Sequence, residues 1–117
     1  MLAARKAEDK KAEDIVLLDM KKASGGIADY VLIVSANSGV HMKTLRDAIE
    51  ESLYKKNLKP IHQDGRRSDQ WMALDYGGLL VHILSFAARR LYNLERLWEN
   101  AKEVSWDSNS SRKRKKR

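Results

Sequence analysis

Residues 71–82 constrain the fold of this 117-residue chain more than any other segment. They contain two short β-rich runs separated by Gly77-Gly78, a dipeptide typical of two-residue hairpin turns. Strand side chains alternate between faces, so one face of the hairpin is apolar throughout and is expected to lie in the core. The turn predicts three cross-strand pairs on this face: Tyr76 with Leu79, Leu74 with Val81, and Met72 with Ile83.

The second face of the hairpin is mixed in character. It carries Trp71, Ala73 and Asp75 on one strand, opposite His82 and two leucines on the other. An indole, a carboxylate and an imidazole among aliphatic side chains are typical of a surface that meets a partner. For Trp71 the sequence leaves two interpretations open: it packs under the last helix, or it anchors a protein partner.

The composition restricts the class of protein. The length fits one domain with a single core. No apolar run approaches the roughly 20 residues of a membrane helix, and the first residues lack the apolar stretch of a signal peptide. The absence of cysteine excludes disulfides, thiol catalysis and cysteine-ligated zinc. We expect a cytoplasmic protein without a membrane segment.

The positive charge is concentrated at the C-terminus. The net charge is +7, and six of these charges lie between Arg112 and Arg117, so the rest of the chain is nearly neutral. Residues 105–117 are rich in serine and basic residues, a composition that does not form a core. We therefore expect a folded domain over residues 1–104 and a disordered tail, which is either solvated or in contact with RNA phosphates.

Hydrophobic periodicity predicts the order helix, two strands, helix, three strands, helix. The first helix covers residues 2–13 and the first two strands cover 15–20 and 30–35, the second apolar on both faces. The next helix is capped by Asn37 or Ser38, and Pro60 places the strand at 59–63 near a sheet edge. The fold class is α/β, a single domain with a mixed sheet of about five strands flanked by helices.

The last helix is expected over residues 86–101. Apolar residues recur there at three- and four-residue spacing and predict an inner stripe: Ala87, Leu91, Leu94, Trp98 and Ala101. Trp98 is therefore interpreted as core. Trp106 lies beyond this helix and is expected to be loosely held.

Carboxylates near strand ends raise the question of magnesium. Asp19, Asp29 and Asp75 occupy such positions, but none forms the close Asp-x-Asp pair of two-metal nucleotidyl transfer. The loop from Ser35 to Gly39 lacks the glycine spacing of a nucleotide-binding loop and is read as a capped helix start. We expect no metal and no cofactor.

The histidines do not form a recognisable centre. His41, His62 and His82 belong to three separate elements, and nothing in their spacing predicts zinc. A triad of Ser35, His82 and Asp75 would lack the nucleophile elbow that presents a catalytic serine. We therefore expect no catalytic residue.

Several segments together resemble the ribosomal silencing factor family, also called Iojap-like proteins. They are residues 14–19, 28–34 and 37–41, the Trp-Met-Ala-Leu-Asp-Tyr-Gly stretch of 71–82, and the Leu-Tyr-Asn-Leu-Glu-Arg-Leu-Trp stretch of 88–98. The chain departs from the family pattern at Gly78, where aspartate is usual, and at Gly39 and Val40, where the family commonly has Ser-Arg.

The resemblance implies a fold akin to nucleotidyltransferases without their catalytic carboxylates. It also implies binding to ribosomal protein fourteen of the large subunit, which blocks joining of the small subunit and represses translation when nutrients are scarce. Family members often form homodimers. The competing hypothesis is a magnesium-dependent nucleotidyltransferase-like enzyme that uses Asp19 and Asp29.

The resemblance does not locate the docking residues, so we take them from the mixed face of the hairpin and its border: Trp71, Met72, Asp75, Tyr76 and His82. Trp71 is expected to supply buried area. Asp75, aided by Asp64 and Asp69, is expected to meet basic groups of a ribosomal protein.

Overall fold

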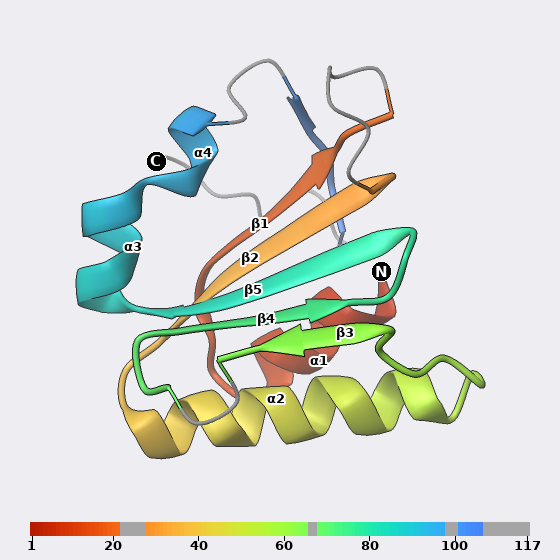
Figure 1. The fold of residues 1–117 in the computed structure, drawn as a ribbon, viewed down its shortest axis with the longest axis horizontal. Coiled ribbons are helices and arrows are strands. Elements are labelled where there is room, and N and C mark those ends of the chain that lie inside the picture. Colours follow the sequence, from red (N-terminus) through yellow and green to blue (C-terminus); the bar gives the residue numbers. More distant parts are fainter. Residues whose placement is uncertain (22–27, 66–67, 98–100, 107–117) are drawn as a thin grey trace.

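The computed structural model describes residues 1–21, 28–65, 68–97 and 101–106. Within them, a six-stranded mixed sheet has helices on both faces (Figure 1). The α/β prediction is confirmed, with one strand more than expected. None of the helices in these ranges combines the length and apolarity that crossing a membrane requires.

The strand order across the sheet is β3-β4-β5-β2-β1-β6, and only β2 and β5 run parallel. The strands are β1 (Glu13–Asp19), β2 (Tyr30–Ala36), β3 (His62–Asp64), β4 (Trp71–Asp75), β5 (Leu79–Ser85) and β6 (Lys102–Glu103). The helices are α1 (Leu2–Asp9), α2 (Gly39–Tyr54), α3 (Phe86–Tyr92) and α4 (Leu94–Leu97).

Two hydrophobic cores lie on opposite faces of the sheet. Helices α1 and α2 cover one face, and α3 and α4 cover part of the other (Figure 1). The central strand β2 contributes Leu32 and Val34 to the first core and Val31 and Ile33 to the second. All four side chains are buried, which confirms the prediction of a strand covered on both faces.

The hairpin has the predicted register. Met72 pairs with Ile83 and Leu74 with Val81, and the backbone N–H of Tyr76 donates to the carbonyl of Leu79. The apolar face of this hairpin lies in the core, as expected, and packs there with residues of α2. Period-two alternation and the Gly-Gly turn were therefore sufficient to predict this part of the fold.

The helix boundaries near the N-terminus differ from the prediction in one place. Helix α1 ends at Asp9 because Lys11 takes a left-handed conformation with φ of 69°, and β1 begins at Glu13. Helix α2 starts as expected, with the Ser38 side chain accepting a hydrogen bond from the N–H of His41 at 3.0 Å.

The predicted helix over residues 86–101 was wrong. Helix α3 ends at Tyr92, because Asn93 adopts a left-handed conformation with φ of 43°, and the short α4 follows. The inner stripe was wrong at two positions, since Leu91 is 75% exposed and Ala87 is exposed. It was right at Leu94, which is buried, and at Ala101, which packs against the same core. The prediction that Trp98 is core lies outside the described residues.

Arg89 determines which side of α3 faces the sheet. Its guanidinium donates to the Ser35 hydroxyl at 2.7 Å and to the Asp14 carbonyl at 2.7 Å, and the residue is buried. Leu91 lies two positions further on, about 200° around the helix, and therefore points away from the sheet. Ala88 takes the buried position on α3, and Leu94 on α4 is buried as predicted.

This orientation predicts a contrast between two leucines. Leu94→Ala should lower the free energy of unfolding by about 2–4 kcal/mol, because Leu94 is only 5% exposed and leaves a cavity. Leu91→Ala should change it by less than about 0.5 kcal/mol. Urea unfolding of both variants measures the difference. Equal costs would contradict the orientation of α3.

The C-terminal described residues pack back onto the domain. The Val104 N–H donates to the Leu17 carbonyl at 2.9 Å, and the N-terminal ammonium of Met1 donates to the Trp106 carbonyl at 2.7 Å. Trp106 also packs against the core on the α1 side, so it is not loosely held. The folded part extends at least to this residue.

Candidate functional site

The mixed face of the hairpin lies on the same side of the sheet as α3. Trp71, the first residue of β4, is half-buried there between two rings. Its ring centre lies 4.8 Å from that of Tyr92 on α3 and 5.7 Å from that of His82 on β5. The interpretation that Trp71 packs under the last helix is confirmed for its contact with α3, and the anchoring of a partner stays a prediction.

His82 is not a surface residue. It is 7% exposed, and its Nδ1 accepts a hydrogen bond of 2.9 Å from the Trp71 indole N–H. Burial lowers the pKa of His82 to about 4, so the ring is neutral at neutral pH. Because Nδ1 accepts, the proton of the neutral ring is assigned to Nε2. His82 therefore cannot contact a partner directly.

The burial of His82 predicts a pH dependence of stability. Its pKa is about 4 in the folded protein and near 6.5 when exposed, so the unfolded chain binds the proton more readily. The free energy of unfolding should fall as the pH drops from 6.5 toward 4, by up to about 3 kcal/mol. Urea unfolding of the unchanged protein and of His82→Asn, measured at several pH values in this range, separates the contribution of His82 from that of the carboxylates, which both proteins share. Parallel curves for the two proteins would contradict it.

Two predicted site residues lie on the opposite face from Trp71. Met72 is fully buried in the core beneath α2, so it offers no area to a partner in the folded domain. Tyr76 is half-buried on that same side, and its hydroxyl has no hydrogen-bond partner among the described residues. Burial, with a smaller contribution from Glu50, raises the pKa of Tyr76 to about 12. The structure does not bring these two side chains together with Trp71.

The acidic residues flank the indole at a distance. Asp75 shares a face with Trp71 but lies at the other end of β4, about 13 Å away along the strand. Its Oδ1 accepts a hydrogen bond of 2.8 Å from the Gly77 N–H and so fixes the turn. Asp64 is exposed on the neighbouring strand β3, directly opposite Ala73. Asp69 is exposed in the loop before β4.

Trp71, Asp75 and Asp64 lie on one face of the sheet. Helices α3 and α4 pack on the sheet near β5, β2 and β1, and none of the helices in the described ranges covers β3 and the adjoining part of β4 on this side (Figure 1). We call this area the Trp71 face and define it by five residues: His62, Asp64, Trp71, Ala73 and Asp75. It combines a large aromatic side chain with two carboxylates.

Sequence reasoning missed the contribution of α3. Tyr92 is 52% exposed and in ring contact with Trp71, so it borders the Trp71 face. Phe86 and Leu91 on the same helix are exposed as well. The adjacent Leu91 and Tyr92 could have indicated an exposed apolar surface on this helix. The predicted inner stripe instead assigned Leu91 to the core.

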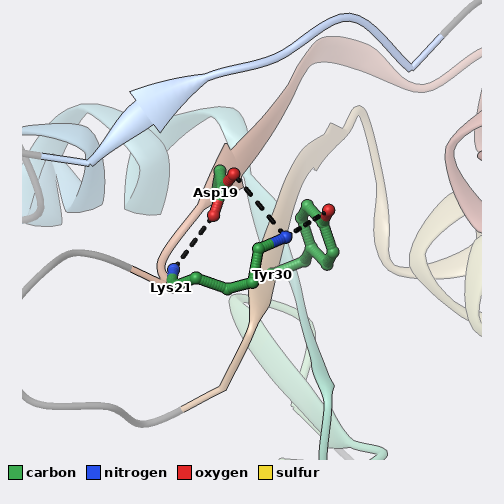
Figure 2. A network of polar contacts seen from close by, with 3 residues as sticks. All are labelled: Asp19, Lys21 and Tyr30. Carbon is green, nitrogen blue, oxygen red and sulfur yellow. Dashed lines mark hydrogen bonds and ion pairs between the residues drawn. The ribbon is translucent and has the colours of Figure 1, made fainter.

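Asp19, one of the carboxylates considered for magnesium, takes part in a local polar network. Figure 2 shows Asp19 with Lys21 and Tyr30: Asp19 Oδ1 accepts from the Lys21 backbone N–H at 3.0 Å, and the ammonium lies 3.7 Å from Oδ2. The same ammonium donates to the Tyr30 hydroxyl at 2.7 Å. In the part of the chain that the structure describes, no three acidic or histidine side chains are grouped as metal ligands would be.

The hypothetical triad is not assembled. The Ser35 hydroxyl accepts a hydrogen bond from Arg89, and His82 Nδ1 accepts one from Trp71. Neither group is directed at the other or at Asp75, which is bound to the turn. The loop from Ser35 to Gly39 is a capped helix start, as predicted: the Asn37 N–H donates to His41 Nδ1, in addition to the Ser38 cap.

Comparison with known proteins decides the family. The model of the family described as "Ribosomal silencing factor during starvation" matches residues 1–117. The chain belongs to this family. It is similar to ribosomal silencing factor RsfS of Bacillus subtilis, with 34% identity over 100 residues that cover 86% of this chain and 84% of the relative.

Two further similarities support the assignment. A protein of Arabidopsis thaliana named "Protein Iojap-related, mitochondrial" is 32% identical over 76 residues, covering 61% of this chain and 41% of that protein. The fold is similar to the crystal structure of a Chromobacterium violaceum protein, with a TM-score of 0.79 and 25% identity over 95% of this chain and 91% of the other. The resemblance to ribosomal silencing factors in the sequence is thereby confirmed.

Proposed function

We propose that this protein docks on the large ribosomal subunit through ribosomal protein fourteen and keeps the small subunit from joining. The observation that carries the proposal is the Trp71 face, an open sheet surface with a fixed aromatic residue, in a member of the ribosomal silencing factor family. Aromatic side chains set in a partly polar surface are typical of the centre of protein interfaces.

The proposed mechanism is steric. A stable interface needs about 800 Å² from each partner, which a domain of this size can supply. A body attached where the two subunits meet then excludes the small subunit without making or breaking a covalent bond. Translation would fall when nutrients are scarce, in the cytoplasm, and no cofactor or catalytic residue would be needed.

The charge of the surface favours a basic partner. Asp64 and Asp75 lie on the Trp71 face and Asp69 lies in the loop that leads into it. A ribosomal protein carries lysine and arginine side chains that hold RNA phosphates, and such groups complement these carboxylates. Opposite charges at the rim would speed association and orient the complex.

Two further elements complete the proposal. The basic tail, whose residues 107–117 lie outside the described part of the chain, would add salt-dependent contacts to ribosomal RNA through Arg112 to Arg117. The free protein would form a homodimer.

Truncation after Trp106 tests the tail. Binding to large subunits should weaken and lose part of its salt dependence. Complete loss of binding would show that the tail, and not the folded domain, makes the main contact with the ribosome.

An order-of-addition experiment tests the function. Isolated large subunits are incubated with the protein, small subunits are added, and the particles are separated by sedimentation. The protein should travel with large subunits and reduce the yield of joined ribosomes. An undiminished yield with the protein in saturating excess would refute the proposal. Calorimetry with a nucleoside triphosphate and Mg²⁺ checks the enzyme alternative, which requires binding heat that Asp29→Asn abolishes.

A further inference from the structure

We infer that His82 is a positioning residue for Trp71, which it holds in place for the partner while removing the indole N–H from the surface. The inference rests on the proposed function, because it assigns a role within the same docking site. Its consequence concerns the chemistry of the partner: the contact at Trp71 is made by an apolar side chain.

The hydrogen bond between the two rings carries the inference. The Trp71 N–H donates to His82 Nδ1 at 2.9 Å, and the histidine is buried, with only 7% of its surface exposed. A hydrogen bond in a buried setting is shielded from competing water and therefore holds its geometry well. The acceptor is also fixed in place, since His82 belongs to the central part of β5, with β2 on one side and β4 on the other.

The second support of Trp71 is Tyr92. The two ring centres lie 4.8 Å apart with a tilt of 46° between the planes, a favourable arrangement for an aromatic pair. His82 fixes the polar atom of the indole and Tyr92 packs against its ring. Trp71 is thus held by a strand on one side and a helix on the other before any partner arrives.

The hydrogen bond also limits what Trp71 can offer. The indole has a single polar group, its N–H donor, and His82 accepts from it. Whatever part of the side chain remains accessible consists of carbon atoms. An aliphatic or aromatic side chain of the partner fits such a surface, whereas a carbonyl or carboxylate would find no donor on Trp71.

Holding a side chain in its bound orientation reduces the entropy that association loses. Immobilising one rotamer-rich side chain at an interface weakens binding by roughly threefold to tenfold. We therefore expect His82→Phe, which keeps a ring but lacks the acceptor, to weaken binding to isolated large subunits by about fivefold. His82→Asn places an amide oxygen near the position of Nδ1 and should restore much of this loss.

A double-mutant cycle separates positioning from a general structural role. In a Trp71→Phe background the donor is absent, so adding His82→Phe should change the affinity by less than about twofold. Each variant is first checked for folding by thermal unfolding. An unchanged affinity of a folded His82→Phe variant, or an equal loss in both backgrounds, would overturn the inference.

A measurement on the free protein keeps the inference distinct from the proposed function. The indole N–H resonance of Trp71, identified by its absence in Trp71→Phe, should shift and exchange faster with water in His82→Phe. A shifted resonance together with normal binding of large subunits by Trp71→Ala would show that the hydrogen bond exists but that the proposed docking site is wrong. If the resonance does not move, the positioning role itself is refuted.

Discussion

Replacing Trp71 with alanine should weaken binding to isolated large ribosomal subunits by about 30-fold, which corresponds to about 2 kcal/mol. Trp71 is the largest side chain on the Trp71 face, and two rings hold it before binding. Its removal takes away buried area at the expected centre of the interface and leaves Tyr92 without its neighbour. Sedimentation with labelled protein measures the affinity.

The matched control for this experiment is Tyr54→Ala. Tyr54 is also a large exposed aromatic residue, but it lies on α2, which covers the opposite face of the sheet. This variant should bind within about twofold of the unchanged protein. A folded Trp71→Ala variant with normal affinity, or an equal loss in both variants, would remove the Trp71 face from the proposed interface.

Gly65→Ala should lower the free energy of unfolding by about 3 kcal/mol. Gly65 has a φ of 74°, a conformation that residues with a Cβ rarely adopt, and an added Cβ would overlap the backbone carbonyl oxygen of Trp71. Backbone atoms cannot move aside as a flexible side chain can, so the start of β4 must shift. Urea unfolding measures the loss.

Gly78→Ala is the control for backbone strain. An added Cβ at Gly78 would come no closer than 3.7 Å to the nearest atom, the Asp29 carboxylate, which is an ordinary contact. This variant should stay within about 1 kcal/mol of the unchanged protein. Similar losses for both glycines would show that the close approach of Gly65 to Trp71 is not the cause.

The displacement of β4 in Gly65→Ala should also weaken ribosome binding.

Local signals in the sequence predicted much of the sheet. The Gly77-Gly78 turn and the alternation around it determine the hairpin register, and the continuous apolar run of β2 indicates burial on both faces. The Ser38 cap and the apolar spacing of α2 predict that helix for the same reason. Each of these patterns is completed within a few residues, so it can be read from the local sequence.

Signals that depend on distant contacts were misread or missed. The inward side of α3 follows from the contacts of Arg89 with Ser35 and Asp14, which lie on other strands. The short strand β6 exists because residues 102 and 103 return to pair with β1. Spacing within a helix cannot reveal a buried arginine whose partners lie more than fifty positions away.

The sequence by itself determined which residues of the hairpin share a face, because backbone geometry enforces the alternation of side chains. It also determined the family, through two specific stretches of residues. Only the tertiary structure decided how each face is used. Alternation assigns His82 and Asp75 to the same side, but His82 is buried and in ring contact with Trp71, whereas Asp75 at the end of β4 stays partly exposed.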